Sequence, residues 1–251
     1  MKLTGNTILI TGGATGIGLA LAESFLKEGN EVVICGRRED KLAEAKEKFP
    51  VLHIITCDVS IENERKKLFK RIKSEFGGLN ILVNNAGIQQ EINFLDGTEV
   101  VDRAVDEIRI NFESPVALSS MFIPLFNGKQ NSAIINVSSG LAFVPIAIMP
   151  IYSATKAALH SFTVSLRYQL KDTTIKVFEV IPPIVDTDLD KGARKARGQT
   201  DFGIKPEIVA EETITAMKND VYEIPVGFAK NIMNNSRADF ENVFKFMNGS
   251  R

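Results

Sequence analysis

The chain has 251 residues, and its 30 lysines and arginines against 31 aspartates and glutamates give a formal net charge of −1. This balance argues against binding of nucleic acid, which requires a basic surplus, and a hydrophobic content of 44% argues against a disordered or coiled-coil chain. The longest apolar stretch, residues 141–151, is too short to span a membrane, and two cysteines cannot build a disulfide framework, so we expect a cytoplasmic protein without membrane insertion.

Short apolar runs alternate with longer helical patterns along the chain. Each run is rich in β-branched residues and continuously apolar, which is typical of parallel strands covered on both faces. We expect strands at 7–11, 31–35, 52–57, 80–83, 133–137, 175–180 and, more weakly, 221–224. We expect helices at 16–29, 38–48, 61–76, 98–126, 151–171 and 206–219, and one more that reaches residues 246–247.

The alternation of strands and helices defines the fold class. It predicts an α/β protein with a single Rossmann-like, doubly wound parallel sheet of about seven strands and helices on both faces. Right-handed crossovers leave few topologies for such a chain. No repeat or linker divides the sequence, so we expect a single domain over residues 1–251.

A glycine-rich turn joins the first strand to the first helix. It places Gly12, Gly16 and Gly18 between a strand and an amphipathic helix. Glycine permits a tight turn and lets backbone N–H groups approach a pyrophosphate at the helix N-terminus. The spacing G-x-x-x-G-x-G differs from the commoner G-x-G-x-x-G of dinucleotide folds, and an ordinary strand-to-helix turn is the alternative. The strand–turn–helix context favours a nucleotide site.

The end of the second strand indicates the choice of dinucleotide. An acidic residue there would accept hydrogen bonds from the adenosine ribose and favour NAD. This chain has Gly36 at that place, followed by Arg37 and Arg38. Because guanidinium groups suit a 2′-phosphate, we expect NADP(H) to be preferred over NAD(H). The alternative is that both arginines only solvate a helix start, a role that fits Arg38 better than Arg37.

A tyrosine and a lysine share one face of the helix expected at 151–171. Tyr152 and Lys156 are four residues apart, and Ser139 lies thirteen residues upstream of Tyr152, after the strand at 133–137. An ammonium beside a phenol lowers the tyrosine pKa from its free value near 10, so Tyr152 can exchange a proton with a carbonyl or alcohol oxygen. The Ser139 hydroxyl can hold the same oxygen. A surface helix pair is the alternative for a lone Tyr-x-x-x-Lys.

Several motifs follow one another in order along the chain, at residues 11–18, Asp58, 84–87, Asn111, Ser139, 152–156 and 182–187. In this order they resemble the short-chain dehydrogenase/reductase family, in its short single-domain branch, over about residues 5–225. The resemblance implies that Tyr152 is the general acid/base and that Ser139 orients the substrate oxygen. It also implies that Lys156 lowers the tyrosine pKa and binds the nicotinamide ribose, and that Asn111 holds a water of the proton relay.

The same resemblance implies a set of cofactor contacts. Asp58 and Val59 would flank the adenine, residues 85–87 would line the ribose and nicotinamide, and Val185 and Thr187 would meet the carboxamide. The full set is Gly12, Thr15, Gly16, Ile17, Gly18, Arg37, Asp58, Val59, Asn85, Ala86, Gly87, Tyr152, Lys156, Val185 and Thr187. These positions follow strands, where open α/β sheets bind ligands.

The chain departs from the family pattern at three places. Thr15 stands where many NADP-dependent members carry a basic residue, so Arg37 must supply most of the phosphate recognition. Pro183 replaces a glycine and, because proline fixes φ and lacks an N–H, restricts the loop that carries Val185 and Thr187. The third departure is a C-terminal helical extension over about 226–248. Together with residues 140–143 and 182–187, this extension is similar to the corresponding segments of the DltE-type oxidoreductases.

We therefore expect an NADP(H)-dependent oxidoreductase that transfers hydride between nicotinamide and a small-molecule carbonyl or alcohol. A substrate lid is expected over about 188–204, where charge and glycine are concentrated. The resemblance implies a homodimer or homotetramer formed through the helices at 98–126 and 151–171. No cluster of metal-ligating side chains is present in the sequence, so we expect no metal.

Two other functions compete with this interpretation. One is a dinucleotide-binding sensor or regulatory protein with little catalysis, against which the intact Ser139, Tyr152 and Lys156 argue. The other is a sugar-nucleotide epimerase or dehydratase. Those relatives carry a longer substrate domain and a different glycine spacing, so the oxidoreductase is favoured.

Overall fold

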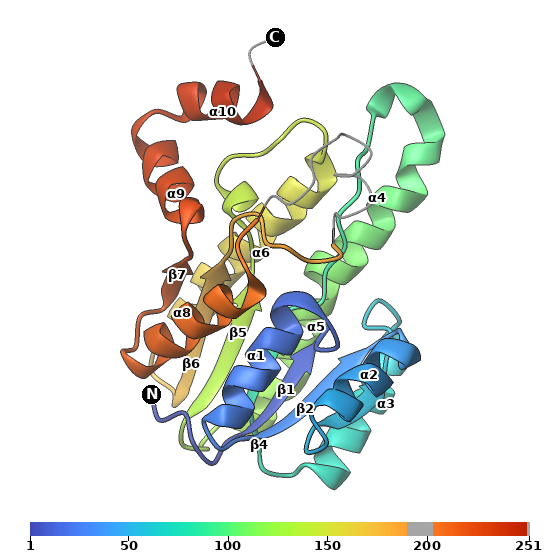
Figure 1. Cartoon of the computed structure of the whole chain (residues 1–251), viewed down its shortest axis with the longest axis vertical. Helices are drawn as coiled ribbons and strands as arrows, with labels where there is room; N and C mark the ends of the chain where they lie inside the picture. Colours follow the sequence, from blue (N-terminus) through green and yellow to red (C-terminus); the bar gives the residue numbers. More distant parts are fainter. Residues whose placement is uncertain (190–202, 250–251) are drawn as a thin grey trace.

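The computed structural model of the chain describes residues 1–189 and 203–249, in which seven parallel strands form one sheet. The strand order is β3-β2-β1-β4-β5-β6-β7 (Figure 1). The strands are β1 (Thr7–Thr11), β2 (Glu31–Gly36), β3 (His53–Thr56), β4 (Leu79–Asn84), β5 (Ser132–Val137), β6 (Ile175–Ile181) and β7 (Glu223–Pro225). The order runs outward from the β1–β4 pair in both directions, so the predicted doubly wound, Rossmann-like sheet is confirmed.

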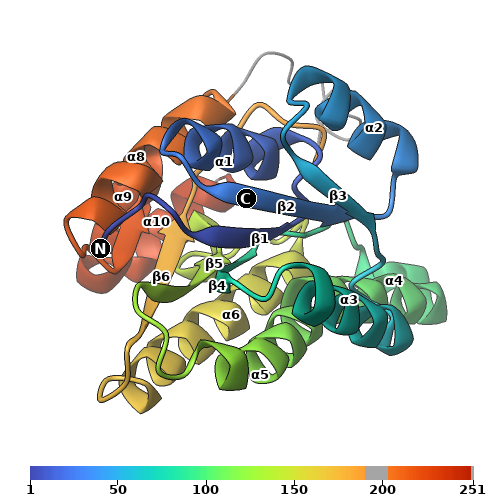
Figure 2. The ribbon, with the colours of Figure 1, turned by 90° about the horizontal axis from the view of Figure 1, so that it is seen from below.

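Helices cover both faces of the sheet. Figure 2 shows α1, α2 and α8 on one face and α3, α5 and α6 on the other. The α-helices are α1 (Gly16–Lys27), α2 (Glu39–Lys48), α3 (Glu62–Glu75), α4 (Val100–Ile108), α5 (Ser114–Phe126), α6 (Pro150–Gln169), α8 (Pro206–Lys218), α9 (Phe228–Ala238) and α10 (Phe240–Asn248). Within the described ranges, no helix has the length and apolar character needed to cross a membrane.

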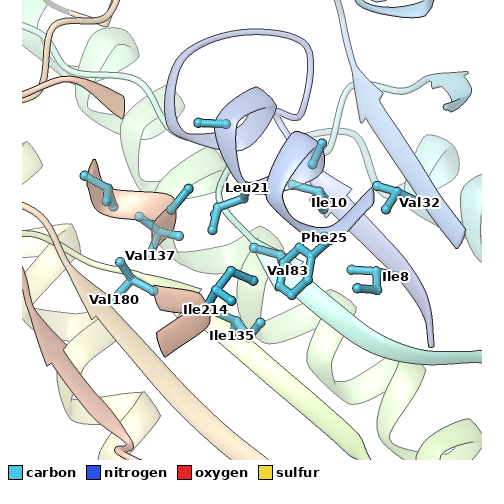
Figure 3. Close-up of a cluster of buried hydrophobic side chains, with 14 of the residues drawn as sticks. Ile8, Ile10, Leu21, Phe25, Val32, Val83, Ile135, Val137, Val180 and Ile214 are labelled. Atoms are coloured by element: carbon cyan, nitrogen blue, oxygen red, sulfur yellow. The ribbon is translucent and has the colours of Figure 1, made fainter. Parts of the chain in front are cut away.

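Successive side chains of the central strands enter two separate cores. Ile8 and Ile10 of β1 pack with Phe25 in the cluster beneath α1 (Figure 3). Leu9, between them, packs with Phe122 on the opposite face. Full burial of such a side chain stabilises the fold by about 1.5–3 kcal/mol. The continuously apolar strand sequences therefore reflect burial on both faces, as expected of a parallel sheet.

The helix predicted over 98–126 is interrupted in the structure. A 3₁₀-helix (Phe94–Glu99) precedes α4, and a π-helical segment (Arg109–Glu113) separates α4 from α5. The sequence prediction missed this break because apolar periodicity does not reveal one extra residue in a turn. The π segment contains Asn111, whose amide contacts the loop after β4. Such segments occur frequently at functional sites.

The chain ends in two helices rather than the single helix predicted from its pattern. Asp239 separates α9 from α10, and its carboxylate accepts a hydrogen bond from the backbone N–H of Asn242 at the start of α10. At the other end of α10, the Asn248 amide donates to the Pro145 carbonyl at 3.1 Å. The C-terminal helices are thereby tied to the segment that joins β5 to α6 (Figure 1).

Candidate active site

The glycine turn follows β1 and lies against the ends of other strands. Gly12 and Gly16 have φ values of +63° and +56°, a region that favours glycine. A Cβ on Gly12 would lie 2.9 Å from the Ala86 Cα, and a Cβ on Gly16 would lie 2.9 Å from the Thr187 Cγ2. Both glycines are therefore required by the backbone and by the close approach of neighbouring segments. Ile17 and Gly18 follow in the first turn of α1.

Hydrogen bonds hold the glycine turn to the end of β4. The Asn85 side-chain amide donates to the carbonyls of Thr11 and Gly12, each at 3.0 Å. The Thr11 hydroxyl accepts from the backbone N–H groups of Asn85 and Ala86, at 3.0 and 3.1 Å. Two loops that are more than seventy residues apart in sequence thus form one rigid surface.

Two arginines follow β2, and they contact different residues. Arg37 is half-exposed, and its Nη1 lies 3.6 Å from the Asp58 Oδ2. Arg38 donates from Nη2 to the Thr15 hydroxyl at 3.0 Å. The alternative role at a helix start was expected to fit Arg38 better than Arg37; in the structure the Arg38 guanidinium also reaches the glycine turn. A cation thereby lies next to Thr15, where the sequence itself lacks a basic residue.

Ser139, Tyr152 and Lys156 are all buried, at relative exposures of 7%, 6% and 4%. Ser139 follows β5, and its oxygen accepts the Leu141 N–H at 3.1 Å. Tyr152 and Lys156 lie one turn apart on α6, with the ammonium 5.6 Å from the centre of the phenol ring. The ammonium also donates to the Val137 carbonyl at 2.8 Å, which fixes α6 against the end of β5.

Burial changes the proton affinity of Lys156. Because the charged form loses its hydration, burial lowers the pKa of Lys156 from 10.5 to about 8, and the charge of Glu179 opposes this decrease. The lysine is therefore close to its titration range at neutral to mildly alkaline pH.

Asn111 lies next to the same lysine. Its side chain accepts from the N–H of Ile88 at 2.9 Å and donates to the carbonyl of Ile88 at 2.8 Å. A Cβ on Gly87 would lie 3.3 Å from the Asn111 Oδ1 and 3.7 Å from the Lys156 Nζ. Asn111 and Lys156 therefore both border Gly87.

The remaining predicted contacts lie around this centre. Asp58 accepts two bonds from Ser60, to N at 2.9 Å and Oγ at 2.7 Å, and Val59 is buried beside it. Val185 is buried and forms a parallel bridge with Ile204. Thr187 lies against Gly16, so Pro183 does not prevent its loop from approaching the glycine turn. The lid predicted over 188–204 lies for the most part outside the described residues.

The structure also reveals polar residues that the sequence analysis did not place in the site. Glu179 of β6 is completely buried and contacts Ser138 and His160. The sequence offered one signal for this buried carboxylate, because Glu179 stands inside the otherwise mainly apolar run of residues 175–180. Among the described residues, no group of three or more metal-ligating side chains forms a metal site.

The sheet topology and this cluster define a dinucleotide-dependent oxidoreductase fold. Residues 6–198 match the family model for short chain dehydrogenases, so the chain belongs to the short-chain dehydrogenase family and is an NAD(P)-dependent oxidoreductase. It is 47% identical to the uncharacterized oxidoreductase DltE of Bacillus subtilis over 248 residues, which cover 99% of this chain and 98% of that relative. The predicted DltE-type subgroup is thereby confirmed.

Solved structures share the same fold. A short chain dehydrogenase/reductase from Burkholderia phymatum, in complex with NAD, superposes with a TM-score of 0.87 at 20% identity and covers 100% of this chain and 98% of its own. A short chain dehydrogenase from Burkholderia cenocepacia, in complex with NADP, has a TM-score of 0.84 at 24% identity, and the match covers 98% of this chain and 99% of that chain. At these identities the likeness shows the fold alone.

Proposed function

We propose that this chain transfers hydride between NADP(H) and a carbonyl or alcohol substrate, with Tyr152 as the general acid/base. The observation that carries the proposal is the buried pair of Tyr152 and Lys156 on α6. The Lys156 ammonium binds the Val137 carbonyl, two residues before Ser139, and lies with Asn111 around Gly87. When bound, the dinucleotide supplies or accepts a hydride at nicotinamide C4. Carbonyl reduction consumes one hydride and one proton, and the residues of the chain must deliver the proton.

The glycine turn fits a dinucleotide. Side chains at Gly12 and Gly16 would clash with neighbouring segments, and the turn opens onto the N-terminus of α1, whose dipole favours a pyrophosphate. The residues that would hold the cofactor are those predicted from the sequence: Gly12, Thr15, Gly16, Ile17, Gly18, Arg37, Asp58, Val59, Asn85, Ala86, Gly87, Tyr152, Lys156, Val185 and Thr187.

The proton chemistry follows from the buried cluster. In the reductive direction the Tyr152 hydroxyl donates its proton to the substrate oxygen, and the Ser139 hydroxyl holds that oxygen by a hydrogen bond. The Lys156 ammonium stabilises the phenolate that remains. Asn111 binds the Ile88 backbone and borders Lys156, and a water held there would pass a proton by way of Lys156 back to the Tyr152 phenolate. The oxidative direction reverses these transfers.

Tyr152→Phe tests the acid/base role. We expect a loss of kcat of about 10²–10⁴-fold, the contribution typical of general acid–base catalysis, with NADPH binding retained. Tyr168→Phe is the matched control, because Tyr168 lies on the same helix with 71% exposure. Activity is measured as NADPH oxidation over aldehydes, ketones, quinones and keto-esters. NADPH binding without turnover of any substrate would instead favour a sensor.

Preference for NADP(H) is part of the proposal, because Arg37 and Arg38 supply two guanidinium groups at the end of β2. We expect Arg37→Asp to weaken NADPH binding by about tenfold or more, since a hydrogen bond to a charged group contributes about 1.5–3 kcal/mol. NADH binding should change little. Arg71→Asp, on the exposed surface of α3, controls for the change of net charge. Equal losses for both dinucleotides would refute the phosphate role.

Assembly and location complete the proposal. Exposed apolar side chains on α4 and α6, including Val101, Ile108 and Val164, support a homodimer or homotetramer formed through these helices. Light scattering after size-exclusion chromatography measures the oligomeric state. Cys35 and Cys57 are both buried free thiols, which supports a cytoplasmic location. The single seven-stranded sheet supports one domain over residues 1–251.

A further inference from the structure

A buried carboxylate lies on β6, next to the edge strand β7, without a role in the proposed chemistry. Glu179 has no exposed surface, and both its oxygens are occupied. Oε1 accepts the Ser138 hydroxyl at 2.6 Å, and Oε2 lies 2.9 Å from the His160 Nδ1. A buried carboxylate is costly unless it is paired and hydrogen-bonded, so these two contacts account for how the fold tolerates the charge.

The contacts of Glu179 reach the strand end that carries the proposed catalytic serine. Ser138 lies between Val137, whose carbonyl binds the Lys156 ammonium, and Ser139. On α6, His160 is one turn beyond Lys156, which is one turn beyond Tyr152. The end of β5 is therefore joined to one stripe of α6 twice: Val137 binds Lys156 directly, and Glu179 bridges the next residue, Ser138, to His160.

His160 is enclosed by the segment that follows Ser139. Its ring lies 4.6 Å from the Phe143 ring, centre to centre, and Phe143 packs onto a cluster formed by Ile181, Ala229 and Met233. The imidazole is thereby held in one orientation by a carboxylate on one side and an aromatic ring on the other.

Building on the proposed function, we propose that Glu179 and His160 are positioning residues. The Glu179 carboxylate fixes the end of β5 through Ser138 and supplies the negative charge that keeps Lys156 in its ammonium form. His160, as an imidazolium, compensates that charge. Neither residue touches the substrate or the nicotinamide, and both act on Tyr152 through Lys156.

The charges around the pair agree with this assignment. The hydrogen bond to Glu179 raises the pKa of His160, and partial burial opposes this increase. The charges of Glu179 and of Glu223 on β7 raise the pKa further, whereas the charge of Arg167 on α6 lowers it. Glu179 likewise opposes the decrease that burial imposes on the pKa of Lys156. From β5, the group that faces Glu179 is the Ser138 hydroxyl. With a neutral residue at position 179, burial would lower the pKa of Lys156 and no negative charge would oppose that decrease.

The first experiment measures the charge state of His160 without requiring turnover. The chain has two histidines, so ¹⁵N side-chain spectra contain two imidazole signals, and His53→Gln assigns them. We expect His160 to titrate above 6.5 in the native protein and at a lower pH in Glu179→Gln, because the charged acceptor that raises its pKa is removed. A neutral His160 at pH 6.5, with the native fold intact, would overturn the proposal.

The second experiment separates charge from packing. Glu179→Gln keeps the shape of the side chain and loses its charge, whereas Glu179→Asp keeps the charge and loses one methylene. We expect the alkaline limb of the kcat/KM profile to move down by about one pH unit in the glutamine variant only. An unmoved limb in a folded Glu179→Gln, or equal shifts in both variants, would show a merely structural role. Absence of turnover in the native protein would refute the proposed function instead, while the histidine titration would still test the charge pair.

Discussion

Replacement of Lys156 by methionine tests whether the proposed site is maintained at the expense of stability. The native ammonium is buried, and its pKa falls from 10.5 to about 8. Each pKa unit corresponds to 1.36 kcal/mol, so at pH 7 the buried charge opposes folding by up to about 3 kcal/mol. Methionine removes this cost while retaining most of the side-chain volume.

The lost hydrogen bond acts in the opposite direction. Methionine leaves the buried Val137 carbonyl without the Lys156 ammonium, which costs about 1–3 kcal/mol. At pH 7 we therefore expect Lys156→Met to be between equally stable and about 2 kcal/mol more stable than the native protein. The variant should have lost its activity. A more stable and inactive variant would indicate a trade-off between stability and function.

The pH dependence gives a sharper test, because the hydrogen-bond cost does not vary with pH. Between pH 8 and 10.5 the unfolded chain binds more protons at Lys156 than the native chain, so native stability rises with pH. The advantage of Lys156→Met over the native protein should shrink by about 2 kcal/mol between pH 7 and 9.5. Urea unfolding at several pH values measures the free energy of unfolding of both proteins. The contributions of the other titrating groups cancel in the difference between the two free energies. A difference that is independent of pH would refute the burial argument.

Two further predictions concern the glycine turn and a second buried carboxylate. Gly12→Ala should destabilise the protein by about 1–3 kcal/mol and abolish NADPH binding, because its φ is +63° and its Cβ would lie 2.9 Å from Ala86. Gly36→Ala, with nothing within 4 Å of its Cβ, is the control, and equal thermal midpoints for the two would contradict the reasoning. Burial raises the pKa of Glu107, which accepts the Gln90 N–H, from 4.5 to about 7. The stability of the native protein should therefore fall relative to that of Glu107→Gln as the pH rises from 4.5 to 7. Urea unfolding measures both stabilities, and an equal dependence on pH in the two proteins would contradict the raised pKa.

Much of the architecture could be predicted from the sequence because its signals are local. Apolar runs bounded by helical patterns predicted the seven strands and the doubly wound sheet. The turn at Gly12 and Gly16, and the pair Tyr152 and Lys156, also depend on short spacings. Helix periodicity alone places Tyr152 and Lys156 on one face, in any fold that makes that segment helical.

The breaks within helices were not predictable in this way. One extra residue converts a turn around Asn111 into a π segment, and this shift follows from the contact between its amide and Ile88. That contact joins residues 23 positions apart, so no local pattern contains it.

The sequence by itself predicted which residues can carry the proposed chemistry, since the side chains of tyrosine, lysine and serine have the same functional groups in any fold, and glycine the same backbone freedom. Only the tertiary structure decided which side chains lie next to one another and which buried charges are compensated by a neighbouring group. Arg38 contacts Thr15 across 23 residues, and Glu179 joins Ser138 to His160 across three different elements. These contacts arise where neighbouring strands end at one edge of the sheet, and the energy of a buried charge depends on all its neighbours together. For that reason the proton affinity of Lys156, on which the proposed chemistry depends, is a property of the folded chain.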